Sequence, residues 1–159
     1  MKLMHIGWII RLTIDQTAPH LIRDRKHPSA ATTFDRCFIG SELTDWLMNS
    51  TMSSSHVKVR SRKQAESVYQ VLYENKVIYA VFPQSSTSSQ EEDCFQDRYA
   101  FYRFCFDDAE DGQAQSLMAY FRQTVPPDEG SLIDALFENL SYLLQMAPEA
   151  TLRQILRKK

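Results

Sequence analysis

Two groups of basic residues have the clearest capacity for chemistry in this sequence. The first group comprises Arg23, Arg25, Lys26 and Arg36. The second group comprises Lys58, Arg60, Arg62 and Lys63. Each cation near an anionic membrane contributes about 1 kcal/mol to the binding free energy. Either group alone therefore predicts weak, reversible lipid binding. Firmer binding needs both groups or a partner domain. An alternative of equal weight is that the charges are merely solvated, the first group at a helix end where cations are favourable.

Residues that could catalyse a reaction or hold a metal ion do not form a known pattern. The chain has four glycines, and it contains neither a Gly-rich phosphate loop nor a Gly-x-Ser-x-Gly turn. His5, His20, His27 and His56 are separated from one another and from any pair of cysteines, so we expect no metal and no cofactor. The charges in Phe95–Arg98 could act in binding, but an ion pair that braces the predicted hairpin is at least as good an explanation. The sequence therefore predicts a non-catalytic domain.

The charge is unevenly distributed along the 159 residues. Residues 1–80 contain 11 Lys/Arg and 7 Asp/Glu, a net of +4, whereas residues 81–159 contain 7 and 13, a net of −6. The overall charge of −2 disfavours a nucleic-acid-binding protein, while the basic first half suits an anionic surface. Three cysteines, an odd number, predict reduced cytosolic thiols. We expect Cys37 to be buried and Cys94 to be exposed.

The chain up to Arg25 is expected to be helical, with a break around Ala18-Pro19. Residues 1–10 are apolar, but Arg11 interrupts them before the ~20 residues that a transmembrane helix needs, and no signal-peptide cleavage site follows. The spacing of the isoleucines predicts an amphipathic helix that breaks at Pro19. A second helical segment is predicted from Leu21 to Arg25, and a loop over residues 27–33.

The stretch Cys37–Met48 is the predicted centre of the core. A short apolar run meets the Gly40-Ser41 break, and a helix capped by Ser41 is predicted to run to Met48. Trp46 lies on the apolar face of this helix, and Trp46→Ala should lower the stability of the protein by roughly 3–5 kcal/mol. The residues predicted to form the core are Phe38, Leu43, Trp46, Leu47, Val68, Leu72 and Tyr102.

A third helix and a β-hairpin complete the predicted domain. Ser61 and Gln64 fit a capping box at the start of the helix, and Asn75 marks its end. Val77–Phe82 and Tyr99–Phe104 are rich in β-branched and aromatic residues and predict antiparallel strands. The loop between them, residues 84–93, is rich in serine and acidic residues.

Helical patterns continue to the end of the sequence. A short helix is predicted around Leu117–Phe121, and leucines at helical spacing predict another over residues 132–144. Pro148 is predicted to start the last helix. The apolar face of these helices either folds back on the preceding domain or packs on a partner.

Several motifs carry a resemblance to a known family. Phe34-Asp-Arg-Cys-Phe-Ile-Gly-Ser-Glu-Leu-Thr-Asp-Trp-Leu-Met48 resembles the signature of DEP domains. Leu21–Lys26 and Phe95–Arg98 with Phe101–Phe104 are similar to the start and end of the DEP domain in Epac-type exchange factors for Rap. Ala147–Lys158 resembles the helix that follows it. These motifs occur in the same order as in that family.

The resemblance implies a fold, a domain layout and a function. The fold is α+β and mostly helical, a winged-helix-like three-helix bundle plus β-hairpin with additional C-terminal helices. The layout is a helical lead-in over residues 1–20, a DEP domain over 21–106, and a helical extension over 107–159 that leads to the next domain. The function is a cytoplasmic regulatory module of a Rap-type guanine nucleotide exchange factor, recruited peripherally by anionic lipid such as phosphatidic acid or by a membrane-associated protein.

Other parts of such an exchange factor are not recognised in these residues. The catalytic domain that would contact a Rap-family GTPase is not among them. The Gly-Glu and Arg-Ala phosphate cassette of cyclic-nucleotide pockets is also not found, which favours a Repac-like branch. A branch with a cAMP domain further downstream in the parent protein stays open as the alternative. The oligomeric state stays open.

Residues 27–33 depart from the family pattern, because Epac-type members carry a basic and aromatic arm where this chain is neutral and small. This weakens the membrane hypothesis and leaves the fold hypothesis intact. Docking to a receptor tail or signalling partner is the alternative, and it requires an apolar patch. DNA binding, which a winged helix also permits, is disfavoured because Glu66 and Glu74 lie on the third helix.

Overall fold

The computed structural model describes residues 2–51, 59–82, 94–124 and 129–157, and for residues 129–131 and 147–157 it describes the backbone alone. Five α-helices and a four-stranded antiparallel sheet make up this part of the chain, the mostly helical α+β fold that the sequence predicts. In chain order the elements are α1 (Lys2–Thr17), η1 (Pro19–Leu21), β1 (Arg23–Lys26), β2 (Thr33–Ile39), α2 (Gly40–Thr51), α3 (Arg62–Glu74), β3 (Ile78–Phe82), β4 (Phe101–Phe104), η3 (Cys105–Asp107), α4 (Gly112–Thr124) and α5 (Glu129–Arg157).

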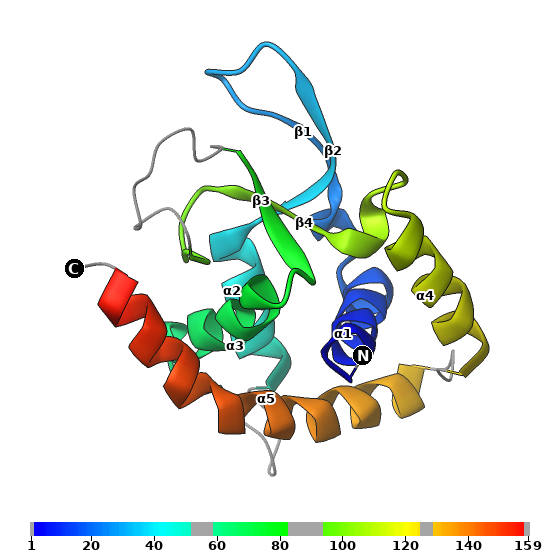
Figure 1. Cartoon of the computed structure of the whole chain (residues 1–159), viewed down its shortest axis with the longest axis vertical. Helices are drawn as coiled ribbons and strands as arrows, with labels where there is room; N and C mark the ends of the chain where they lie inside the picture. The colour runs from blue at the N-terminus through cyan, green and yellow to red at the C-terminus, as the bar shows by residue number, and fades with distance from the viewer. Residues whose placement is uncertain (1, 52–58, 83–93, 125–128, 158–159) are drawn as a thin grey trace.

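The sheet has the strand order β1-β2-β4-β3 (Figure 1). The predicted hairpin is confirmed as β3 and β4, which pair antiparallel with Ile78 opposite Phe104. The predicted loop over residues 84–93 lies outside the described residues. On its other side β4 pairs with the end of β2, where Phe38 lies opposite Tyr102. The chain enters α2 directly from β2, so the sheet fixes where α2 begins.

The prediction that Leu21–Arg25 is helical was wrong. Residues 23–26 form β1, which pairs antiparallel with β2 and continues into the predicted loop. This second hairpin projects from the body of the molecule (Figure 1). The misassignment has a physical cause. All four residues of this edge strand are charged, so it shows no alternation of apolar residues.

The residues predicted for the core are all buried. Phe38, Leu43, Leu47, Val68 and Leu72 have no exposed surface, and Tyr102 and Trp46 are 3% and 8% exposed. The indole Nε1–H of Trp46 donates to Oγ1 of Thr17 at 3.1 Å. The core therefore joins α2 and α3 to the sheet and also to the end of α1.

The helix predicted at the N-terminus is confirmed as α1, and it lies deep in the structure. Ile6, Ile9, Ile10 and Ile14 are at most 2% exposed, and Pro19 begins the short 3-10 helix η1. No helix among the described residues is both long enough and apolar enough to cross a membrane.

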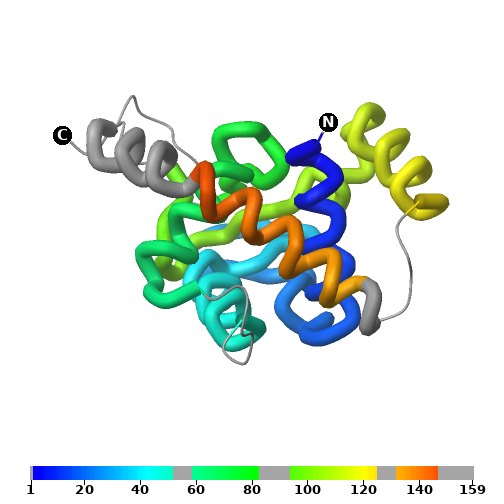
Figure 2. Tube along the Cα trace, turned by 90° about the horizontal axis from the view of Figure 1, so that it is seen from below, coloured from blue at the N-terminus to red at the C-terminus, as the bar shows by residue number. Residues whose placement is uncertain are grey.

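The C-terminal helices fold back on the core. The predicted helix near Leu117 is confirmed as α4, and α5 packs across α3 and α1 with Leu132, Leu136 and Leu140 buried (Figures 1 and 2). The prediction that Pro148 starts a separate helix was wrong, because α5 is continuous from Glu129 to Arg157. A proline can kink a helix without ending it.

One predicted helix boundary needs correction, and another is confirmed. Helix α2 includes Gly40 and extends to Thr51, so Ser41 lies inside it rather than capping it. Helix α3 ends at Glu74 with Asn75 as its C-cap, as predicted, and Lys76 rather than Asn75 adopts the left-handed conformation, with a φ of 61°.

Candidate functional site

The first basic group lies on the β1–β2 hairpin. Arg23 and Lys26 are exposed on β1, and Arg36 is exposed on β2. Among the described residues, neither Arg23 nor Lys26 has an ion-pair partner. The hairpin thus presents cations on an element that projects from the body of the molecule (Figure 1).

Arg25 differs from its neighbours because its side chain turns inward and is 7% exposed. Its Nε donates to the carbonyl oxygen of Cys37 at 3.1 Å and its Nη2 to that of Leu21 at 2.8 Å. A longer contact of 3.4 Å reaches Glu42 on α2. Burial lowers the pKa of Arg25, and the charge of Glu42 opposes that shift. Arg25 therefore links β1 to β2 and to η1, with a weaker contact to α2.

Arg36 lies in a β-bulge. The register between β1 and β2 shifts near it, and its φ of 44° is uncommon for a residue other than glycine. The backbone N–H of Arg36 donates to Oδ1 of Asp24 at 2.9 Å. Its Nη2 lies 3.2 Å from Oδ1 of Asp107, although its side chain stays 59% exposed. The bulge directs this cation toward η3, so the side chain of Arg36 links the hairpin to η3.

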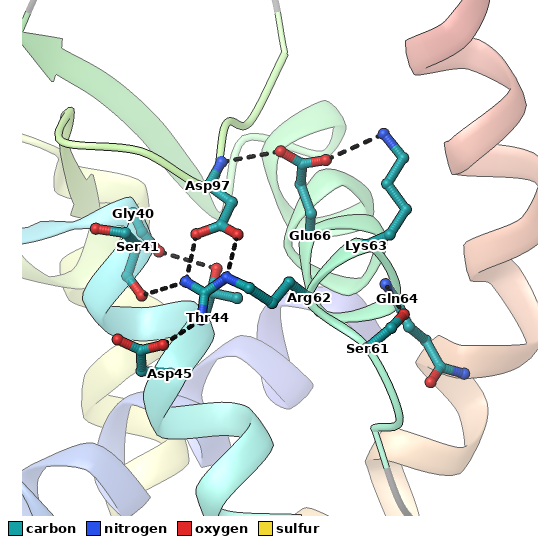
Figure 3. A network of polar contacts seen from close by, with 10 residues as sticks. All are labelled: Gly40, Ser41, Thr44, Asp45, Ser61, Arg62, Lys63, Gln64, Glu66 and Asp97. Atoms are coloured by element: carbon teal, nitrogen blue, oxygen red, sulfur yellow. Dashed lines mark hydrogen bonds and ion pairs between the residues drawn. The ribbon is translucent and has the colours of Figure 1, made fainter.

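The second basic group is centred on Arg62, at the start of α3. Its Nε and Nη2 donate to the two carboxylate oxygens of Asp97, both at 2.7 Å. Its Nη1 pairs with Asp45 on α2, and Nη2 also approaches the carbonyl oxygen of Ser41 at 3.3 Å (Figure 3). The hydrogen bonds that Arg62 donates to Asp97, and then to Asp45, raise the pKa of Arg62. Arg62 therefore joins α2, α3 and the segment before β4.

The neighbours of Arg62 extend this network. Nζ of Lys63 lies 3.3 Å from Oε1 of Glu66, whose Oε2 accepts from the backbone N–H of Asp97 at 2.9 Å (Figure 3). Arg60 is exposed, and Lys58 lies outside the described residues. The two predicted groups thus differ in their pairing. On the hairpin, Arg23 and Lys26 have no ion-pair partner among the described residues, whereas Arg62 and Lys63 are both paired with carboxylates.

The predicted capping box is present in a modified form. The side-chain oxygen of Ser61 accepts from the backbone N–H of Gln64 at 3.1 Å. The side chain of Gln64 reaches back to the N–H of Arg60 at 2.7 Å, and not to that of Ser61. The box sets the position of Arg62, the first residue of α3.

An aromatic cluster beside the hairpin was not predicted from the sequence. The ring of His27 lies 4.6 Å from that of Phe82 and 5.3 Å from that of Tyr99, which is 49% exposed. Phe34 lies 5.2 Å from Phe82, and Phe101 is buried beneath. Tyr99 and Phe101 lie two residues apart in the second predicted strand, and this spacing was the available signal, because alternate residues share one face of a sheet.

No group of side chains suited to a metal ion occurs among the described residues. The prediction that Cys94 is exposed was wrong, since it is 1% exposed. Cys37 is buried as predicted, and burial raises its pKa. Burial also raises the pKa of Cys105 to about 12. These raised pKa values disfavour the nucleophilic thiolates of Cys37 and Cys105.

A comparison with protein families places this geometry in context. Residues 20–104, more than half of the chain, match the family described as "Domain found in Dishevelled, Egl-10, and Pleckstrin (DEP)". The matched segment contains both basic groups, α2, α3 and all four described strands, whereas α1, α4 and α5 lie outside it. The match is to the family as a whole and names no branch.

Proposed function

Because the chain belongs to the DEP domain family, we propose that it is a non-catalytic module that docks a signalling protein at an anionic membrane surface through its β1–β2 hairpin. The observation that carries this proposal is the exposure of Arg23 and Lys26 on a projecting element, without ion-pair partners among the described residues (Figure 1). Arg36 adds a partly paired cation to the same hairpin. Arg25, Arg62 and Lys63 contribute less, because they already hold protein partners.

Charge and aromatic character support docking of modest strength. Two or three cations at about 1 kcal/mol each give weak, reversible and salt-sensitive binding. His27 directly follows Lys26, and its ring lies 5.3 Å from that of Tyr99. Aromatic rings with a polar edge are favoured at the level of lipid headgroups. The module therefore acts best together with a second membrane contact elsewhere in its parent protein.

The proposed parent is a Rap-type guanine nucleotide exchange factor of the Epac/Repac group. The motifs Leu21–Lys26, Phe95–Arg98 and Ala147–Lys158 support this assignment. In such a protein a Rap-family GTPase binds a separate catalytic domain, and this module supplies location rather than exchange activity.

Co-sedimentation with vesicles tests the membrane proposal. The chain is mixed with phosphatidic-acid/phosphatidylcholine vesicles and with pure phosphatidylcholine vesicles, from low to high salt. We expect binding only to the anionic vesicles, lost as salt rises. Arg23→Glu with Lys26→Glu should abolish it with little change in melting temperature. A matched control, Lys2→Glu with Lys76→Glu, makes the same charge change on exposed residues outside the hairpin. Equal loss in both variants, or binding to neutral vesicles alone, would contradict the proposal.

Docking to a protein is the second candidate, and the partly exposed aromatic cluster favours it. Tyr99 and Phe82 offer apolar contact area of the kind used at protein interfaces. If the chain ignores anionic vesicles, Tyr99→Ser should weaken capture by cytoplasmic tails of membrane receptors, while Arg23→Glu should not.

A further inference from the structure

A pocket of about 590 Å³ lies between α1, α4 and η3, with Arg36 of the hairpin at one side. Its volume is within the range of small-molecule sites. The apolar part of its wall is formed by Trp8, Leu12, Phe106 and Met118. Trp8 and Met118 belong to helices outside the matched DEP segment. The pocket is therefore largely made by the flanking helices and is separate from the proposed membrane contact of Arg23 and Lys26.

The charged residues of the pocket are unequal in number, with Arg11, Arg36 and Arg122 facing Asp15 and Asp107. Arg11 is 7% exposed and forms two hydrogen bonds with Asp107, at 2.8 and 3.0 Å. Asp107 also pairs with Arg36, as described above, and Asp15 lies 3.7 Å from Arg11. Both carboxylates are thus engaged by Arg11 and Arg36, which leaves one positive charge in excess.

Arg122 supplies that excess charge. Within the described part of the chain it has no carboxylate partner, and its guanidinium lies 6.0 Å from the ring of Trp8 and 3.8 Å from the sulfur of Met118. This cation–π contact orients the guanidinium, and its N–H groups other than the one directed at Met118 stay available for an acceptor. The ring of Phe106 meets that of Trp8 edge-on at 5.2 Å. A cation and an aromatic wall therefore stand side by side.

From this arrangement we infer that the pocket binds an organic anion in which a phosphate monoester or carboxylate is joined to an aromatic body. The anionic group accepts hydrogen bonds from Arg122 and from the free N–H groups of Arg36. The aromatic body packs on Trp8, Phe106 and Met118. The backbone of Arg36, in the left-handed region, is the kind of strained position that clusters at ligand sites.

The pocket should prefer a ligand that has both an anionic group and an aromatic body over a ligand that has only one of them. Inorganic phosphate meets the arginines but leaves the apolar wall exposed to water, and a neutral aromatic compound covers the wall but leaves Arg122 without an acceptor. Each should bind at least tenfold more weakly than a molecule that has both groups.

Titration with 1-naphthyl phosphate, followed by nitrogen–proton correlation NMR, tests the inference on the whole chain. The sequence has two tryptophans, and Trp46→Phe assigns the two indole resonances. We expect saturable shifts of the Trp8 indole resonance and none at Trp46. Inorganic phosphate and 1-naphthol are the matched probes, and equal binding of either would overturn the inference.

Variants locate the binding. Arg122→Gln should lower the affinity for 1-naphthyl phosphate at least tenfold without altering the rest of the spectrum. Arg98→Gln, a matched change of an exposed arginine that does not line the pocket, should leave the affinity unchanged. The hairpin variant Arg23→Glu with Lys26→Glu should also keep this affinity, so a failure of the membrane proposal is distinguishable. An absent Trp8 shift, or equal affinity in Arg122→Gln, would refute the site.

Discussion

Arg62 and Asp97 meet in a two-pronged ion pair, in which Nε and Nη2 of the arginine each lie 2.7 Å from one carboxylate oxygen. The pair links the first residue of α3 to the segment that leads into β4 (Figure 3). The side chain of Arg62 is 46% exposed and that of Asp97 17% exposed. A planar guanidinium fits this geometry, whereas an ammonium group does not.

We therefore expect Arg62→Lys to destabilise the protein even though the charge is kept. Because the pair is partly exposed, solvent screens it, and the loss should be roughly 0.5–1 kcal/mol in urea denaturation. Arg60→Lys, a neighbouring exposed control, should show no loss. A double-mutant cycle of Arg62→Lys and Asp97→Asn should give a coupling energy of similar size. Zero coupling would show that the pair does not contribute to stability.

Arg25 and Arg23 are two residues apart but should respond very differently to replacement. Arg25→Ala removes the donors to the carbonyl oxygens of Cys37 and Leu21 in a buried place, which should cost about 1–3 kcal/mol in free energy of unfolding. Arg23→Ala changes an exposed side chain and should cost less than about 0.5 kcal/mol. Thermal and urea denaturation of both variants checks this. Equal melting temperatures would contradict the buried role of Arg25.

The comparison of these arginines shows what the sequence could reveal about the site. Residue type and spacing identified the two basic groups. Residue type and spacing did not show that the side chain of Arg25 turns inward. They also did not show that Arg62 is paired, because the partners of Arg62, Asp45 and Asp97, are 17 and 35 residues away along the chain. Burial and long-range pairing are set by tertiary packing, which has no local signature.

More of the fold than of the candidate site could be predicted from the sequence. Apolar periodicity located α2, α3 and the β3–β4 hairpin, since these elements bury one face each. The β1–β2 hairpin was not predicted from the sequence, because its first strand is a short, charged edge strand. Pro148 suggested a helix start, but a helix already packed against α1 and α3 can continue past a proline.

Gly7 should resist replacement by alanine despite its place inside α1. Glycine to alanine in a helix normally gains about 1 kcal/mol. A Cβ at Gly7, however, would lie 2.3 Å from Cγ1 of the fully buried Val77, and overpacking costs about 1–3 kcal/mol. We expect Gly7→Ala to lower the free energy of unfolding. At Gly112 nothing lies within 4 Å of such a Cβ, so Gly112→Ala should be neutral or slightly stabilising. A more stable Gly7→Ala would mean that α1 packs more loosely than the structure indicates.

The buried thiols should make stability fall at alkaline pH. Burial raises the pKa of Cys105 from about 9 in the unfolded chain to about 12. The folded state therefore favours the neutral thiol. Its contribution is fully present below pH 9 and is lost as pH rises from 9 toward 12, because the unfolded chain releases its proton first.

Urea denaturation at pH 8 and pH 10 measures this loss. One pH unit above the unfolded pKa, the thiol of Cys105 should account for roughly 1 kcal/mol. Cys105→Ala should therefore lose less stability between the two pH values than the unaltered chain. Buried Tyr69 and Tyr102, whose pKa values burial also raises, contribute to the remaining fall in both proteins. An identical pH response of Cys105→Ala and the unaltered chain would mean that the thiol of Cys105 is exposed to water in solution.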